Sequence, residues 1–126
     1  MYASGLIVPF HDWPAGGGNL NYPLVYQEGL ASVIKDCKER MTALDMRLDN
    51  APKFYFYEAS IILMEAMIRF SHRYAKLARE MAAKEKDKTR KAELISLAET
   101  CEWVPENPAR NLREVMQAHW FAHLTA

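Results

Sequence analysis

The chain has 126 residues, of which half are hydrophobic and a quarter are charged. This composition predicts one domain with a buried core and argues against intrinsic disorder. Sixteen lysines and arginines balance sixteen aspartates and glutamates, so neither a nucleic-acid surface nor an anionic membrane surface is indicated.

The N-terminal segment and the two cysteines bear on the compartment. The start "MYASGLIVPFHD" has no basic region, and Pro9 and His11 interrupt its apolar run, so it is not a signal peptide. No stretch is long and apolar enough to be a membrane span. Cys37 and Cys101 are far apart in sequence, and a single pair without a secretory signal favours buried, reduced thiols. We therefore expect a soluble, cytoplasmic protein.

Residues 1–22 contain all but one of the glycines and show no sustained periodicity, which predicts an extended, glycine-rich N-terminus. From residue 23 to the end the pattern is helical. A first helix is predicted over 23–48, because Pro23 suits a first helical turn and apolar residues then recur at spacings of three and four. The sequence "LDNAP" ends this helix.

A second helix is predicted over 53–84, and it is apolar on almost every side along "FYFYEASIILMEAMIRF". Its polar positions form one narrow stripe, made of Glu58, Glu65, Arg69, His72 and Lys76. A helix that is apolar nearly all round is typical of the interior of a large protein. We therefore expect side chains such as Phe54, Ile62 and Phe70 to need neighbours from outside this chain.

Two further helices are predicted, over 88–103 and 109–123. The charged segment "KEKDKTRK" before the first of them is expected to be a solvated helix end or turn, with a partner surface as the alternative. The sequence "VPENPAR" ends that helix, because proline cannot continue a helix. The predicted fold is all-α, with about four helices, an extended N-terminus and little or no sheet.

Three segments carry a resemblance to a known family: "NYPLVYQEGLASVI", "FYEASIILMEAMIRFSHRYAKLAREMA" and "RKAELISLAETCEWVPENPARNLREVMQAHWFAHL". In content and order they resemble the glycyl radical enzymes, the family of pyruvate formate-lyase and its dehydratase and decarboxylase relatives. The resemblance implies a large cytoplasmic enzyme of anaerobic metabolism, usually a homodimer, built on a ten-stranded α/β barrel wrapped by helices. Residues 1–126 would be a partial domain from that helical shell, with 1–22 as a loop and 23–126 helical.

The resemblance also implies the chemistry of the full enzyme, which cleaves C–C or C–X bonds as a lyase or an acyltransferase. A separate activating enzyme, with an iron–sulfur cluster and S-adenosylmethionine, installs a radical on a backbone glycine. That radical generates a thiyl radical on a cysteine, which abstracts hydrogen from the substrate. Neither cysteine of this chain stands in a "GC" loop motif, and Gly16, Gly17 and Gly18 have no claim to be the radical site.

We therefore expect no catalytic residue and no cofactor in this chain, which would be an internal fragment inactive on its own. Its expected partners are the rest of the full-length enzyme or a second copy of itself, with the activating enzyme acting on the full-length protein. The alternative is a stand-alone helical interaction module, or a decayed paralogue, without catalytic activity.

The loop "PFHDWPAGGGNLNYPLVY" is where the resemblance places substrate contacts, and His11, Asp12, Trp13 and Asn19 are the candidates. An ordinary polar loop is the alternative. No arginine or lysine precedes Lys35, so this loop offers no charge-assisted donor for a pyruvate carboxylate. This favours the dehydratase and decarboxylase branch over pyruvate, although diol-dehydratase-like members tend to place a histidine near the position of Asn19.

His119 and His123 are four residues apart, a spacing that is compatible with metal binding on one helix face. No third acidic or thiol ligand is indicated nearby, and the family resemblance implies no metal here. A packed histidine pair is therefore the favoured interpretation, and no metal site is predicted.

Overall fold

The computed structural model describes residues 21–45 and 48–125, and within these residues the fold is helical without strands. The elements are α1 (Tyr22–Glu28), α2 (Leu30–Ala43), a short 3-10 turn η2 (Leu48–Asn50), α3 (Ala51–Lys84), α4 (Lys88–Trp103) and α5 (Leu112–Thr125). The predicted all-α class is confirmed for the described part of the chain. The predicted extended segment 1–22 lies almost wholly outside the described residues. Across 21–45 and 48–125, no helix is both long enough and apolar enough to cross a bilayer.

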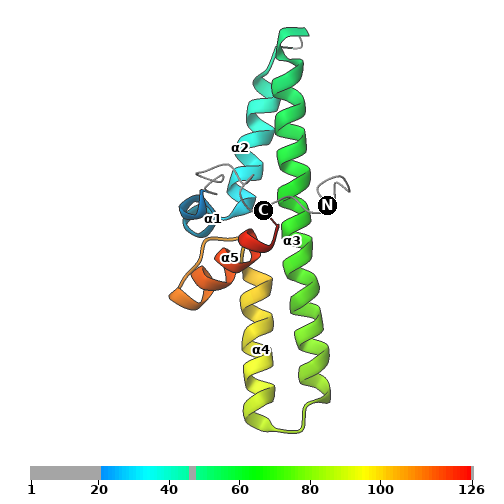
Figure 1. Ribbon diagram of the computed structural model, residues 1–126, viewed down its shortest axis with the longest axis vertical. Helices are drawn as coiled ribbons and strands as arrows, with labels where there is room; N and C mark the ends of the chain where they lie inside the picture. Colours follow the sequence, from blue (N-terminus) through cyan, green and yellow to red (C-terminus); the bar gives the residue numbers. More distant parts are fainter. Residues whose placement is uncertain (1–20, 46–47, 126) are drawn as a thin grey trace, which may run out of the picture.

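Helix α3 is the axis of the molecule. It contains 34 residues and is therefore about 50 Å long. Helix α2 runs antiparallel beside its N-terminal half, and α4 runs antiparallel beside its C-terminal half, while α1 and α5 lie near the middle (Figure 1). Two helical hairpins thus share one long helix and are stacked end to end along it.

The α3–α4 hairpin is packed through small side chains. Ala75, Ala78 and Ala82 of α3 are buried, as is Ala98 of α4. Because these side chains are short, the two helices approach closely, and Leu94 fills the remaining space between them. The turn between the helices begins after Lys84 as predicted from "KEKDKTRK". The side chain of Asp87 accepts a hydrogen bond from the Arg90 N–H and so caps α4.

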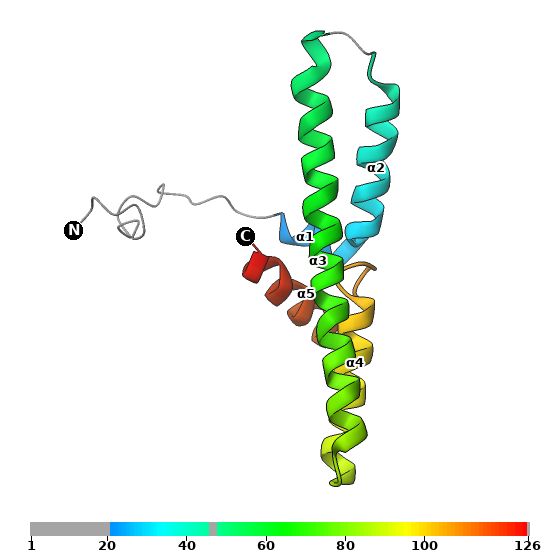
Figure 2. The ribbon, with the colours of Figure 1, turned by 90° about the vertical axis from the view of Figure 1, so that its right-hand side faces the viewer.

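The middle of α3 is held by two apolar clusters. In the first, Leu30, Met67 and Ala122 bring α2, α3 and α5 together. In the second, the buried ring of Phe121 on α5 packs edge-on against Phe70 of α3, with 6.1 Å between ring centroids. These two clusters place α5 across the centre of α3, as Figure 2 shows.

The prediction of one helix over 23–48 is wrong, because Gly29 separates α1 from α2. Gly29 has φ 76°, a left-handed conformation that side chains disfavour. A Cβ atom at this position would lie 2.5 Å from the carbonyl oxygen of Glu106. The missing side chain therefore lets the segment after α4 reach the start of α2.

That segment, residues 104–111, is here named the connector. Its carbonyl oxygens at Pro105 and Glu106 accept hydrogen bonds from the N–H groups of Leu30 (2.9 Å) and Ala31 (3.0 Å). The first N–H groups of a helix have no partner within the helix, and no side chain caps α2. The connector thus satisfies the start of α2 with backbone carbonyls from a distant part of the chain.

The last helix begins at Leu112 and not at the predicted residue 109, because the connector ends in its own side-chain network. The side chain of Asn111 accepts from the N–H of Glu114 at 3.0 Å. The buried carboxylate of Glu114 accepts from the backbone N–H of Arg110 (2.7 Å) and from its guanidinium group (2.6 Å). These hydrogen bonds hold the pKa of Glu114 below its usual value. Arg110 lies 4.2 Å from the ring centroid of Trp103, which closes the turn.

The expectation of an uncovered apolar helix is met on one side of α3 only. Ile62 is 59% exposed, whereas Phe54 and Phe70 are half-buried. Part of the polar stripe faces other segments of the chain and not solvent, since Glu65 lies 3.4 Å from the Lys38 ammonium group of α2. His72 likewise lies 3.1 Å from the Glu106 carboxylate of the connector. Helix α2 and the connector therefore cover part of the polar stripe, and apolar side chains are left on the opposite side.

Replacement of Gly29 by alanine should destabilise the fold. The added Cβ must displace the Glu106 carbonyl or force the connector away, and the left-handed backbone adds strain of about 1–3 kcal/mol. Chemical unfolding followed by circular dichroism measures this loss. Ser32→Ala, at an exposed position three residues later in α2, is the matched control and should change stability by about 0.5 kcal/mol or less. Equal stability of the two variants would show that the close approach at Gly29 contributes nothing.

Replacement of Glu114 by glutamine should cost about 1–2 kcal/mol at neutral pH, because the hydrogen bonds to Arg110 lose their charge. The pKa of Glu114 is lowered by folding, so its stabilisation is fully present above the unfolded pKa of about 4.3 and is lost as pH falls through the folded pKa. The difference in stability between wild type and Glu114→Gln should therefore shrink below about pH 4. Glu28→Gln, at an exposed carboxylate, is the control, and a pH-independent difference for Glu114→Gln would contradict the assignment.

Candidate functional site

The four residues predicted to contact substrate, His11, Asp12, Trp13 and Asn19, lie outside the described residues, so their placement stays a prediction. The structure does show what the described chain meets directly after them. At the start of α1, the ring of Tyr22 lies against the ring of His119 on α5, with 4.1 Å between centroids. The chain that follows the candidate loop is thus anchored on α5.

The two histidines of α5 do not pack on each other. His119 contacts Tyr22, and the ring of His123 lies 6.4 Å from that of Trp120. Both histidines are exposed. Within residues 21–45 and 48–125, no group of three histidine, cysteine, aspartate or glutamate side chains is arranged to hold a metal ion. The prediction of a packed histidine pair is therefore corrected: both histidines are exposed, and each contacts a different aromatic ring.

Both cysteines are free and buried in helices. Burial, with the adjacent Asp36 carboxylate, raises the pKa of the Cys37 thiol on α2. Burial raises the pKa of the Cys101 thiol on α4 to about 11. Each therefore stays protonated at neutral pH, and neither is poised as a thiolate nucleophile. Gly29, the one glycine in the described part of the chain, is in close contact with the backbone of the connector.

A groove of ≈ 290 Å³ lies where α3, α4 and α5 meet. Its walls are mostly large, partly exposed apolar side chains: Tyr74, Leu77, Met81, Leu97, Trp120 and Leu124. The polar residues at its edge are Arg90, which is paired with Glu93 at 2.8 Å, and Gln117. This lining provides no general acid or base beside a nucleophile, but it is suited to packing against apolar protein surface.

Glu106, which pairs with His72, also borders a hollow of ≈ 320 Å³ between α2, α3 and the connector. Both side chains are partly exposed, and the pair joins α3 to the connector. We assign it a structural role, since it fixes the same segment that caps α2. Sequence reasoning missed this junction, although a lone glycine within a helical pattern was a signal for it.

Comparison with known proteins places this arrangement in a family. The family model described as pyruvate formate lyase-like matches residues 1–126. The chain is 46% identical over 106 residues to an isethionate sulfite-lyase from Nitratidesulfovibrio vulgaris, a match that covers 82% of this chain and 13% of that protein. It is 33% identical over 125 residues to the trans-4-hydroxy-L-proline dehydratase of Clostridioides difficile, covering 98% of this chain and 16% of the dehydratase.

The backbone is similar to solved structures as well. The B12-independent glycerol dehydratase from Clostridium butyricum matches with a TM-score of 0.81 and 33% identity, over 85% of this chain and 14% of that one. A glycyl radical enzyme from Archaeoglobus fulgidus matches with a TM-score of 0.79 and 33% identity, over 84% and 14% of the respective chains. The chain thus spans about 13–16% of the length of these relatives. The helical arrangement and the sequence agree, and the chain belongs to the pyruvate formate-lyase-like family of glycyl radical enzymes.

Proposed function

We propose that this chain acts as a helical segment of a larger glycyl radical lyase that cleaves a C–C or C–X bond. The observation that carries the proposal is 46% identity over 106 residues to a lyase of which this match covers only 13%. The proposal places the reacting groups elsewhere in the enzyme, in line with the two buried, protonated cysteines of the described residues.

The apolar groove supports this role, because it offers a surface for the rest of the enzyme. It continues along the outer side of α5, where Leu112 is 74% exposed and Met116 is 66% exposed. Large contiguous apolar patches are rare on soluble monomers and usually mark contact surfaces. In the proposed enzyme, the groove and this side of α5 pack against helices or barrel strands of the remaining chain.

The remainder of the enzyme would supply the radical glycine and the thiyl cysteine, after activation by a separate S-adenosylmethionine enzyme with an iron–sulfur cluster. The proposed location is the cytoplasm. His11, Asp12, Trp13 and Asn19 are proposed to contact substrate from the loop before α1. The absence of arginine and lysine before Lys35 favours a substrate of the dehydratase, sulfite-lyase or decarboxylase relatives over pyruvate.

The chain on its own should show no lyase turnover and no glycyl radical after treatment with an activating enzyme, because the proposal assigns the radical glycine and the thiyl cysteine to the remainder of the enzyme. Electron paramagnetic resonance detects the radical, and product analysis detects turnover with isethionate, glycerol or trans-4-hydroxy-L-proline. A full-length relative, activated in parallel, is the positive control. A doublet radical signal from the isolated chain would overturn this part of the proposal.

A chimeric enzyme tests whether the chain serves as a structural segment. The matched segment of the Nitratidesulfovibrio sulfite-lyase is replaced by the corresponding residues of this chain, and the product should fold, accept the radical and retain turnover. Trp120→Glu in the chimera should abolish activity by placing a charge in the groove. Lys76→Gln, on the solvent side of α3, is the matched control and should retain activity.

The isolated chain carrying Trp120→Glu must remain folded by circular dichroism, since Trp120 is 55% exposed. This measurement separates loss of docking from loss of folding. An inactive chimera, made from a segment that folds normally alone, would contradict the proposal. It would instead favour a stand-alone helical module.

A further inference from the structure

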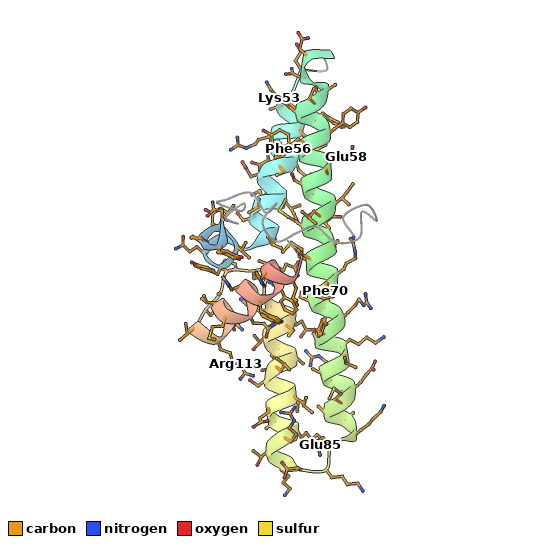
Figure 3. The ribbon with its side chains drawn as sticks, viewed as in Figure 1. Lys53, Phe56, Glu58, Phe70, Glu85 and Arg113 are labelled. Carbon is orange, nitrogen blue, oxygen red and sulfur yellow. The ribbon has the colours of Figure 1, made fainter. Side chains whose placement is uncertain are left out.

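Helix α1 is too short to be stable on its own, so its position depends on contacts with other parts of the chain. It has seven residues, and isolated helices of fewer than about 12 residues are marginal in water. No residue of α1 is buried, and no side chain caps its first turn. Figure 3 shows α1 beside α5, whose first turn is marked by Arg113.

Each end of α1 is held by a residue from the C-terminal part of the chain. At the C-terminal end of α1, the carbonyl of Tyr26 accepts a hydrogen bond from the N–H of Ala109 in the connector, at 2.8 Å. At its N-terminal end, the ring of Tyr22 is stacked on that of His119, with 4.1 Å between centroids and 31° between planes. Tyr22 also packs against the cluster that contains Ala122, about one turn further along α5. The first residue of α1 is therefore fixed against α5.

The position of Tyr22 limits where the end of the candidate substrate loop can lie. Asn19 precedes Tyr22 by three residues, so its Cα atom can be at most about 11 Å from that of Tyr22. His11 precedes Tyr22 by eleven residues and can be up to about 40 Å away. Three glycines, residues 16–18, lie between them, and glycine constrains the backbone less than any other residue. Among the four candidate residues, Asn19 is therefore the one whose place the contact with His119 can fix.

We propose that Tyr22 and His119 form a positioning contact, which holds Asn19 where its side chain can reach the substrate of the larger enzyme. The role of Asn19 rests on the proposed function, whereas the ring contact itself is independent of it. His123, the other exposed histidine of α5, contacts Trp120 instead and has no part in the positioning. Loss of the His119 ring should therefore affect the substrate only through Asn19.

A nitroxide spin label at Asn19→Cys tests the positioning in the chain alone. Electron paramagnetic resonance should show restricted motion of this label. His119→Leu should shorten its rotational correlation time by about twofold or more, because leucine offers no ring for Tyr22 to stack on. His119→Phe, which keeps a ring, should retain the restricted spectrum. His123→Leu, at the other exposed histidine of the same helix, is the matched control and should also retain it.

Three further controls separate positioning from unfolding. The wild-type chain measures unwanted labelling, because both native cysteines are buried. Circular dichroism of His119→Leu should match that of wild type, since position 119 is exposed, and Tyr22→Leu removes the same contact from the other side. A label at Ser4→Cys, eighteen residues before Tyr22, should give the same spectrum in every variant. A spectrum at position 19 that is the same in wild type and His119→Leu would overturn the proposal.

A chimeric enzyme tests the consequence for turnover. Residues of this chain replace the matched segment of the trans-4-hydroxy-L-proline dehydratase, because that match covers 98% of the chain and so includes the candidate loop. His119→Leu should lower kcat/KM about 10-fold, and His119→Phe should stay within about threefold of the parent, since small displacements of a substrate contact are costly. In an Asn19→Ala background, His119→Leu should cost only about twofold or less, because residues that act as a unit are not additive.

Equal losses from His119→Leu with and without Asn19 would show that His119 acts by another route, and would overturn the proposal. Equal losses from His119→Leu and His123→Leu would overturn it as well. An inactive parent chimera would contradict the proposed function alone, since the spin label still decides whether the contact positions Asn19.

Discussion

The approach of the connector to Gly29 is the contact on which the arrangement of the two hairpins depends. Helices α2 and α4 pack on different halves of α3, so packing along α3 alone would not hold one hairpin to the other. The connector links the two hairpins, because its carbonyl oxygens accept hydrogen bonds from the first N–H groups of α2, and Ala109 donates its N–H to the carbonyl of Tyr26 at 2.8 Å. Any side chain at position 29 would occupy the space that the Glu106 carbonyl needs.

The connector also takes part in the other contacts that position the helices. The His72–Glu106 pair ties the connector to α3, and the Arg110–Glu114 network fixes the start of α5. Helix α5 then crosses α3 and places Phe121 in the core, which leaves Trp120 and Leu124 at the groove. The position of the groove is therefore a consequence of how the connector is anchored.

Local signals were enough to predict the elements whose ends are set by local chemistry. The helix over 88–103 was predicted at its observed bounds, since the charged turn and the prolines after Trp103 act on their own neighbours. The break at Gly29 was not predicted, because the apolar spacing continues through it and the reason for the break is a segment far away in the chain. The one-sided cover of α3 depends in the same way on where α2, α4 and α5 lie. The candidate loop around His11 lies outside the described residues and stays a prediction.

The connector also has a consequence for the order in which the chain acquires its structure. Each hairpin is made of contacts between residues that are near one another in sequence, and such contacts form quickly because they close short loops. The bonds from Leu30 and Ala31 to the connector, like the contact of Tyr22 with His119, join residues that are far apart in the described chain and so close long loops. The hairpins are therefore expected to form as separate units on one growing helix, and to become a single cooperative body only when these long loops close.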